Sequence, residues 1–307
     1  MKVLGFNGSP RRMKKIFFIS LLIYVCIYSP CFGKDTIVKE TTANDDKDFI
    51  KIFAEPDYTK DQINFSPLYR NLSPFIPNDE GNKLVATESL DDPALITKAI
   101  YNNWHKDMVA DIRHIGNKKR TGDEFFTFER SEGPLYEASG NQKVTYKGYV
   151  VDEGFLKGRT IISLFSAKIT KDSKIYKDLK ARIEQLRKWE IDNLWIKYEV
   201  DNSNLLGIVL YKRYKDYVML SIVLATHDKI ICHNHITEYR ENGDLFRVDD
   251  MGEFDPANIK FDFLFKTNNA YELVYHWDGA EGRNIYIVRQ YQDRFILGRR
   301  MYQPVSY

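Results

Sequence analysis

The stretch that decides the fold runs from Tyr217 to Tyr239 and reads YVMLSIVLATHDKIICHNHITEY. Apolar and β-branched residues dominate it, and these residue types are enriched in β-strands. A short polar segment separates its two apolar runs, which is typical of a turn. We therefore predict two neighbouring strands, Tyr217–Ala225 and Lys229–Tyr239.

The same pattern continues on both sides of this stretch, from Leu205 to the end of the chain. Turn residues separate the apolar runs at Asn242-Gly243, Thr267-Asn268-Asn269 and Asp278-Gly279. Short strands at such even spacing indicate an antiparallel meander that forms a sandwich or a barrel. The further predicted strands are Leu205–Lys212, Asp244–Val248, Ile259–Lys266, Ala270–Trp277, Arg283–Tyr291 and Arg294–Gln303.

Residues 91–200 predict two amphipathic helices and further strands. The first helix is expected from Pro93 to about His114, because Asp92 supplies an N-cap and proline suits the first helical position. Its apolar stripe recurs every four positions, at Ile96, Ile100, Trp104, Met108 and Ile112, and is widened by Leu95, Ala99 and Val109. The second helix is expected over Ser173–Trp189. The strands predicted here are Glu124–Arg130, Lys143–Asp152 and Arg159–Thr170.

Together these patterns predict an α+β fold that is predominantly antiparallel β, a sandwich or barrel-like meander with two amphipathic helices. The expected order is an N-terminal extension with an export signal over 1–33, an irregular polar lead-in over 34–90, a helix plus antiparallel sheet over 91–200, and a β-meander over 201–307. Four prolines support the irregular lead-in. A domain boundary is expected near Asp201–Asn204.

Residues Met13–Gly33 have the layout of a Sec-type signal peptide. Lys14 and Lys15 precede the apolar run Ile16–Ser29, and small residues at positions 31 and 33 offer a cleavage site. This run is shorter than the roughly 17–25 residues that a membrane-spanning helix needs. We therefore expect an exported soluble protein, periplasmic or extracellular, with no integral membrane segment after cleavage.

Removal of residues 1–33 would change the charge and the cysteine content. Five basic residues leave with them and no acidic one, so the formal net charge of +2 becomes −3. This mild negative charge gives no support to nucleic-acid binding. Cys26 and Cys31 also leave, so the single remaining cysteine, Cys232, has no intrachain partner for a disulfide.

The first twelve residues read MKVLGFNGSPRR. Over about eleven residues this segment resembles the opening of flavodoxin-like, NADPH-dependent FMN reductases and iron–sulfur flavoproteins. The resemblance implies a first strand over Lys2–Phe6 and an FMN phosphate held by the loop Asn7–Arg11. In those families an amphipathic helix follows the loop, whereas here the apolar run of the export signal follows it. An FMN-binding protein is therefore the weaker alternative.

The segment Cys232-His233-Asn234-His235 is the cluster with metal-ligand character. On a strand, alternation places His233 and His235 on one face and Cys232 on the other. The two histidines suit zinc if neighbouring strands supply a third ligand and water holds the open position. A zinc-dependent hydrolase is thus the main alternative function, and the candidate third ligands are His227, Asp228, Glu238 and His276.

Catalytic signatures such as G-x-S-x-G, H-E-x-x-H or a P-loop do not occur in residues 34–307. His276 with Asp278 could be drawn as an acid/base pair, but a chain rich in charged residues produces such pairs freely. No catalytic signature points to a particular residue, and we predict no cofactor, with zinc at His233 and His235 as the alternative. The leading prediction is a non-catalytic binding protein of the bacterial periplasm or cell envelope. Its aromatic-rich β surface would bind a protein, peptide or glycan.

Overall fold

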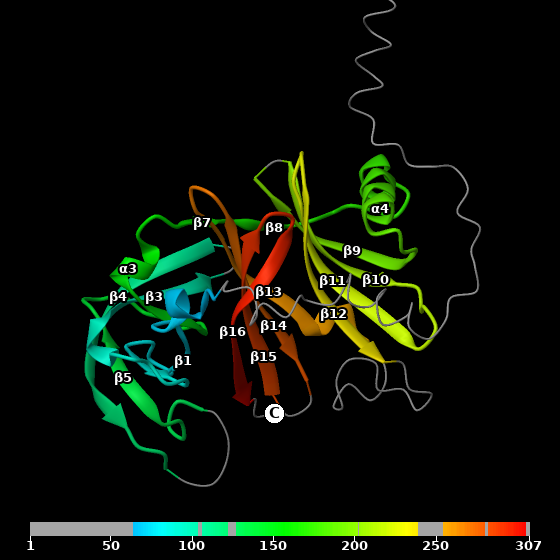
Figure 1. The fold of residues 1–307 in the computed structure, drawn as a ribbon. Helices are drawn as coiled ribbons and strands as arrows, with labels where there is room; N and C mark the ends of the chain where they lie inside the picture. The colour runs from blue at the N-terminus through cyan, green and yellow to red at the C-terminus, as the bar shows by residue number, and fades with distance from the viewer. Residues whose placement is uncertain are drawn as a thin grey trace, which may run out of the picture. The chain divides into compact units, whose positions relative to one another are not determined.

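The computed structural model describes residues 64–103, 106–121, 127–201, 203–238, 254–279 and 282–304. Every described residue belongs to one compact unit, Ile50–Tyr307. This unit contains a closed six-stranded barrel and a ten-stranded sheet (Figure 1). The predicted α+β fold, predominantly antiparallel β, is confirmed. The predicted export signal and the loop Asn7–Arg11 lie outside the described residues.

The barrel has the strand order β1-β2-β5-β4-β3-β6, and every neighbouring pair is antiparallel. Its interior is filled by buried apolar side chains such as Phe75, Leu84, Ile96 and Tyr136. Glycine at 148 lets two strands approach closely, because a Cβ there would lie 2.1 Å from the Ile100 carbonyl oxygen. The strands are β1 (Ser73–Pro77), β2 (Lys83–Ala86), β3 (Ile96–Asn103), β4 (Lys106–Lys118), β5 (Gly133–Ala138) and β6 (Gly148–Asp152).

The predicted helix from Pro93 to His114 is wrong. Asp92 does cap a helix, accepting a hydrogen bond from the Ala94 amide over 3.0 Å, but this is the single 3₁₀ turn η2 (Pro93–Leu95). The chain then continues as β3 and β4. A spacing of four residues is also a multiple of two, so it fits one face of a strand as well as one face of a helix. Val109, expected on the apolar stripe, is 44% exposed.

The predicted irregular lead-in is wrong where β1 and β2 form. Both strands pair with two neighbours in the barrel, although Pro74 and Pro77 lie within β1. Burial of Phe75 and Ile76 stabilises β1 despite the missing proline N–H groups. A short 3₁₀ helix, η1 (Ser66–Tyr69), precedes it. The strand expected over Glu124–Arg130 is also absent from its described part, where residues 127–130 form a bend and turn.

The ten-stranded sheet has the order β7-β13-β14-β15-β16-β12-β11-β10-β9-β8. Its pairs are antiparallel except β12 with β16, which are parallel and meet at Cys232 and Arg294. The strands predicted beyond Leu205 are confirmed, apart from Asp244–Val248, which lies outside the described residues. The strands are β7 (Thr160–Ile162), β8 (Leu164–Ser166), β9 (Ile191–Val200), β10 (Asn204–Tyr211), β11 (Tyr217–Ala225), β12 (Ile230–Glu238), β13 (Ile259–Lys266), β14 (Tyr271–Asp278), β15 (Gly282–Tyr291) and β16 (Arg294–Pro304).

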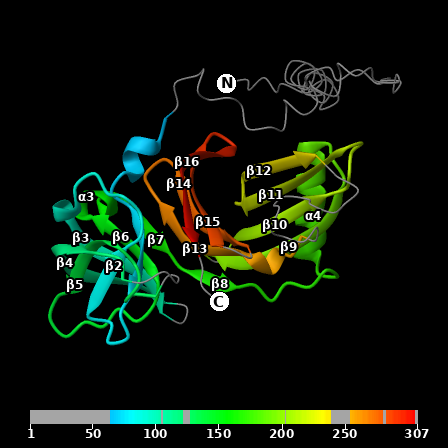
Figure 2. The same cartoon turned by 90° about the horizontal axis from the view of Figure 1, so that it is seen from below.

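One extended segment joins the two edges of this sheet. β7 pairs with β13 at one edge and β8 pairs with β9 at the other, and a single residue, Ser163, separates them. The sheet curls around its interior (Figure 2), so side chains from both halves share one core. This core includes Leu206, Ile222, Leu264, Leu273, Val288 and Phe295.

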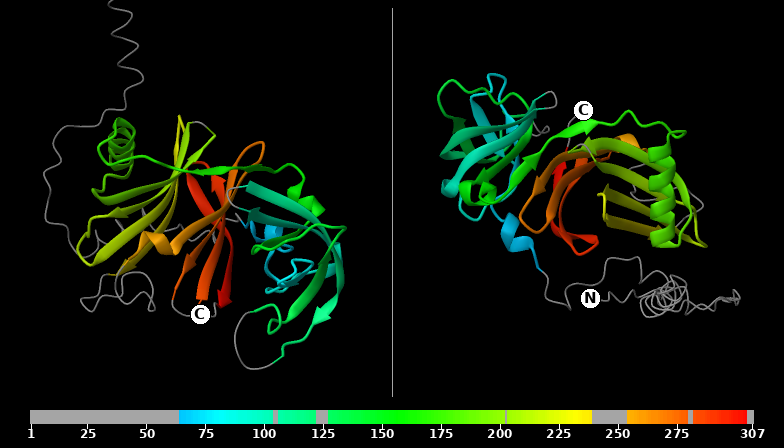
Figure 3. Two further views of the ribbon diagram at one scale, coloured as in Figure 1. Left: turned by 180° about the vertical axis from the view of Figure 1, so that it is seen from behind. Right: turned by 90° about the horizontal axis from the view of Figure 1, so that it is seen from above.

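The helix predicted over Ser173–Trp189 is confirmed as α4 (Lys174–Arg187). Ser173 caps it by accepting a hydrogen bond from the Tyr176 amide, and Lys188 ends it in the left-handed conformation with φ 54°. Buried Leu179 and Ile183 pack α4 beside β9 (Figure 3). A second helix, α3 (Glu153–Leu156), follows β6. Within the described ranges, no helix has the length and apolar character needed to span a membrane.

The expected boundary near Asp201–Asn204 coincides with the turn between β9 and β10. These strands pair from Val200 opposite Asn204 to Ile191 opposite Tyr211, so both sides of the turn belong to one sheet. The chain passes instead from barrel to sheet between β6 and β7. A shared apolar cluster joins barrel and sheet, with Ile100, Tyr149 and Val151 from the barrel and Phe263, Phe265, Val274 and Ile287 from the sheet.

Candidate functional site

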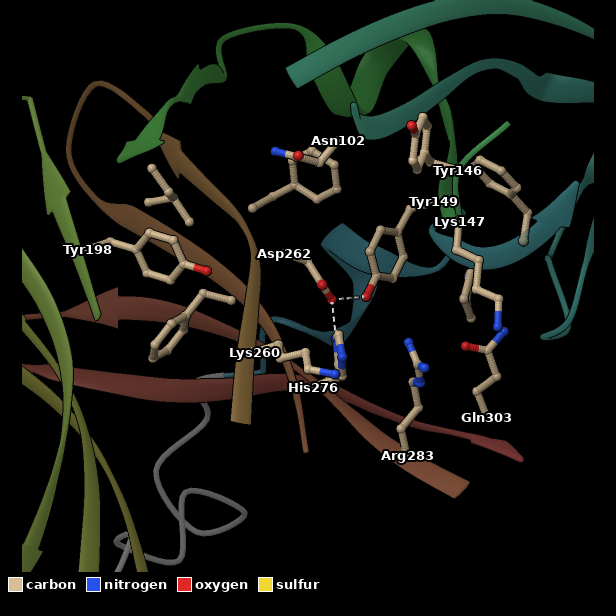
Figure 4. A pocket seen from close by; sticks show the side chains of 16 residues that line it. Asn102, Tyr146, Lys147, Tyr149, Tyr198, Lys260, Asp262, His276, Arg283 and Gln303 are labelled. Carbon is tan, nitrogen blue, oxygen red and sulfur yellow. Dashed lines mark hydrogen bonds and ion pairs between the residues drawn. The ribbon is translucent and has the colours of Figure 1, made fainter. Parts of the chain in front are cut away.

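A pocket of about 480 Å³ lies where residues of the barrel meet residues of the sheet. Figure 4 shows that its polar side chains converge from separate elements. The barrel supplies Asn102 and Tyr149, whereas the sheet supplies Asp262, His276 and Arg283. The pocket is lined by Pro74, Phe75, Asn102, Tyr146, Lys147, Gly148, Tyr149, Leu164, Tyr198, Lys260, Phe261, Asp262, Phe263, His276, Arg283 and Gln303.

Asp262 is the centre of this polar group. Its Oδ2 accepts a hydrogen bond of 2.6 Å from the Tyr149 hydroxyl and lies 2.9 Å from His276 Nδ1 (Figure 4). Burial, together with the charge of Asp262 and the hydrogen bond to it, raises the pKa of Tyr149 well above its ordinary value. The Tyr149 hydroxyl therefore stays protonated and holds the Asp262 carboxylate in one orientation.

A β-bulge turns Asp262 toward the pocket. In the register of β13 and β14, Phe261 faces Tyr275 and Phe263 faces Val274, so Asp262 is the extra residue between them. Such an insertion bends the strand and changes where a side chain points. Regular alternation would have placed Phe261 and Phe263 on one face and Asp262 on the other.

Asp278, next to the pocket, organises a second charged group. Its carboxylate accepts a 2.8 Å hydrogen bond from Lys260 Nζ, and its Oδ1 lies 3.3 Å from Arg283 Nε and 3.6 Å from His276 Nε2. Burial alone would raise the pKa of Asp278, but the Lys260 hydrogen bond and the charges of His276 and Arg283 outweigh it and lower that pKa. The ionised Asp278 therefore holds the Arg283 guanidinium at the pocket.

Aromatic side chains form an apolar wall of the same pocket. The rings of Tyr198 and Phe261 meet edge to face with centroids 5.9 Å apart, and Tyr146 also lines the pocket. Lys147 and Lys260 also line the pocket, and the pKa of Lys147 is lowered by burial and by the charge of Arg283. The pocket thus combines ring faces, one fixed acceptor and fixed donors.

His276 is not placed to exchange a proton with a bound molecule. Its ring is only 7% exposed, and both ring nitrogens face carboxylates of the protein, Asp262 and Asp278. The arrangement therefore favours holding a polar ligand by hydrogen bonds over acid/base catalysis by this imidazole.

His233 and His235 share one face of β12, as predicted, and their ring centroids lie 4.8 Å apart. Cys232 is buried on the opposite side of the strand. His235 Nε2 lies 2.8 Å from the Tyr275 hydroxyl, and Trp277 packs against the same imidazole with centroids 5.5 Å apart. Neighbouring strands thus bring aromatic rings to the two histidines.

The four candidate third ligands do not gather around this pair. His227 and Asp228 are exposed at the turn before β12, and Glu238 lies on the face of β12 that Cys232 occupies. His276 belongs to the pocket around Asp262. Across the ranges that the structure describes, no group of three His, Cys, Asp or Glu side chains is arranged to hold a metal ion.

Sequence reasoning paired His276 with Asp278 but did not find Asp262, Tyr149 or Arg283. The signal for Arg283 was present, since a short connection places β15 beside β14 and sets Arg283 opposite Asp278. Comparison with protein-family models, with characterised proteins and with solved structures finds no match.

Proposed function

We propose that this protein is an exported, non-catalytic binding protein that holds a short, hydroxyl-rich glycan in the pocket around Asp262. The observation that carries the proposal is the convergence of a fixed carboxylate, a fixed guanidinium and aromatic rings in a pocket of about 480 Å³. Sugars offer hydroxyl groups that both donate and accept, and apolar C–H faces that pack on aromatic rings.

The hydrogen bonds around Asp262 support this ligand class. Tyr149 and His276 both bond to Oδ2, and within the described residues Oδ1 has no hydrogen-bond partner. Oδ1 is therefore available to accept a hydrogen bond from a sugar hydroxyl. Arg283, held through Nε by Asp278, supplies the opposing donors. Fixed partners limit the entropy that binding would cost.

The test is isothermal titration calorimetry of the full chain with soluble oligosaccharides of different linkage. Asp262→Ala should weaken binding of any active oligosaccharide about tenfold or more, equivalent to about 1.4 kcal/mol. Asp192→Ala, an exposed position on β9, is the matched control and should leave the affinity unchanged. Circular dichroism on both variants checks that they fold.

Four outcomes would count against the proposal. Saccharide binding that Asp262→Ala does not weaken would show that the binding site lies elsewhere. No detectable saccharide binding at about 10 mM would show that the ligand is not a glycan. If short peptides bind and Asp262→Ala weakens that binding, the ligand of this pocket is a peptide and not a glycan. Release of new reducing ends from the oligosaccharides would contradict a non-catalytic role.

Export rests on the sequence of Met13–Gly33 alone. N-terminal sequencing of the native protein tests it, because cleavage after Gly33 should leave Lys34 as the first residue. A native protein that retains Met13–Gly33 would argue against export by a cleaved signal.

The zinc-dependent hydrolase has less support than the glycan-binding protein, since Tyr275 and Trp277 contact His235 where a third ligand was expected. Elemental analysis of untagged protein tests this alternative. About one equivalent of zinc, lost in His233→Ala, would revive it.

A further inference from the structure

A second pocket, of about 380 Å³, surrounds His233 and His235 on the inner face of the curled sheet. It shares no lining residue with the pocket around Asp262. Its lining comes from β12, β14, β15 and β16: His233, Asn234, His235, Ile236, Thr237, Trp277, Asn284, Tyr286, Leu297 and Arg300.

Its walls are aromatic and tightly packed. Trp277 and Tyr286 are almost fully buried, and their rings approach the His235 imidazole with centroid distances of 5.5 and 5.2 Å. Tyr286 stacks on Tyr275 with centroids 4.9 Å apart and an interplanar angle of 11°. Each ring is thus held by another ring, so the pocket presents fixed flat surfaces.

The electrostatic character of this pocket is one-sided. Arg300 lies over the Tyr286 ring, 5.5 Å from its centroid, and Nη2 donates a 3.2 Å hydrogen bond to Asn284 Oδ1. The lining set contains no carboxylate, and Arg300 has no ion-pair partner in the described part of the chain. Burial, with the charges of His233 and Arg300, lowers the pKa of His235 well below its ordinary value. Arg300 thus supplies a positive charge to a lining that has no carboxylate to offset it.

We infer that this second pocket binds a planar organic anion, whose aromatic ring lies against Trp277 and Tyr286 and whose carboxylate pairs with Arg300. A guanidinium forms two parallel hydrogen bonds with a carboxylate, and an aromatic wall with no acidic residue disfavours cations. The buried His233 side chain, only 2% exposed, gives the site a polar, preformed floor. The volume suits a ligand with one ring. This inference is independent of the proposed glycan binding.

Isothermal titration calorimetry with three probes tests it on the full chain. Benzoate carries both ring and charge, benzamide keeps the ring without the charge, and acetate keeps the charge without the ring. Benzoate should bind at least about tenfold more tightly than either of the other two. Equal binding of benzoate and benzamide, or no benzoate binding at about 10 mM, would overturn the inference.

Variants locate the site. Arg300→Gln should weaken benzoate binding about tenfold or more, and Arg300→Lys should restore part of the loss. Arg294→Gln, at the first residue of β16 and outside the pocket, should leave benzoate affinity unchanged. Asp262→Ala should also leave it unchanged, which separates failure of this site from failure of the glycan site. Benzoate affinity that is insensitive to Arg300 would place binding elsewhere and refute the assignment.

Discussion

Tyr149 on β6 of the barrel donates a hydrogen bond of 2.6 Å to Asp262 on β13 of the ten-stranded sheet. The two residues lie 113 positions apart in the sequence. The same contact therefore has two consequences. It links the barrel to the ten-stranded sheet at a partly buried position, and it fixes the orientation of the carboxylate at the centre of the candidate site.

Tyr149→Phe should lower the free energy of unfolding by about 1.5–3 kcal/mol, the usual contribution of a hydrogen bond to a charged group. The phenylalanine ring keeps its edge-to-face contact with Phe263, so the change removes the hydroxyl and little else. Urea denaturation measures the loss. Tyr291→Phe, at a position 41% exposed, is the control and should change stability by less than about 0.5 kcal/mol. Equal effects of both substitutions would show that the hydrogen bond contributes nothing.

A second buried charged group is centred on Glu272. Glu272 on β14 is fully buried and accepts hydrogen bonds from Arg159 and Arg289. Glu272→Gln removes the negative charge and leaves two guanidinium groups facing each other in a buried site. Breaking a buried pair in this way costs about 3–5 kcal/mol.

Thermal or urea unfolding of Glu272→Gln checks this value against Glu199→Gln, an exposed position on β9. The control should stay within about 0.5 kcal/mol of the unsubstituted protein. A loss below about 1 kcal/mol for Glu272→Gln would mean that solvent reaches the two arginines.

His235 should make stability depend on pH near neutrality. Burial and the charges of His233 and Arg300 lower its pKa in the folded state, so below about pH 6.5 the unfolded chain binds a proton that the folded chain does not. Stability should therefore fall as pH falls from about 6.5, by up to about 1.4 kcal/mol per pH unit from this group. His235→Gln should remove that part of the slope. His227→Gln, exposed at a turn, should leave it unchanged, and an identical slope in both variants would contradict the assignment.

The sequence predicted the ten-stranded sheet well because its strands are local features. β11 begins and ends where the apolar run Tyr217–Ala225 does, and α4 lies within the helix predicted over Ser173–Trp189. The barrel was harder to predict, because β3 and β4 carry apolar residues at a spacing that helices and strands share. Prolines in β1 also hid a strand that tertiary packing stabilises.

The candidate site also combines residues that local sequence patterns predict with residues that they do not. His276 and Asp278 lie two residues apart on one strand, so alternation alone puts them on one face. Asp262 faces this group because of the β-bulge in β13, and Tyr149 does so because the barrel contacts the ten-stranded sheet. Neither a bulge nor a long-range contact leaves a periodic signal in one sequence. Likewise, alternation paired His233 with His235 but could not show that Tyr275 and Trp277 would contact them.

Asp278 lies next to the pocket around Asp262 without lining it. Its pKa in the folded state is lowered, since the Lys260 hydrogen bond and the charges of His276 and Arg283 outweigh the effect of burial. A lowered folded pKa contributes stability that is present above the unfolded pKa of about 3.9 and is lost as pH falls through the folded value.

Asp278→Asn should therefore be less stable than the unsubstituted protein at pH 7, by about 1–3 kcal/mol, and this difference should shrink as the pH falls below about 4. It should also weaken glycan binding, because Arg283 loses the carboxylate that orients its guanidinium. Urea denaturation between pH 3 and 7, with calorimetric titration at pH 7, measures both effects. Asp228→Asn, at a side chain 82% exposed, should alter neither stability nor glycan affinity.

A stability difference independent of pH would mean that Asp278 stabilises the fold through its shape and not through its charge. Full glycan affinity in Asp278→Asn would mean that Arg283 needs no support from it.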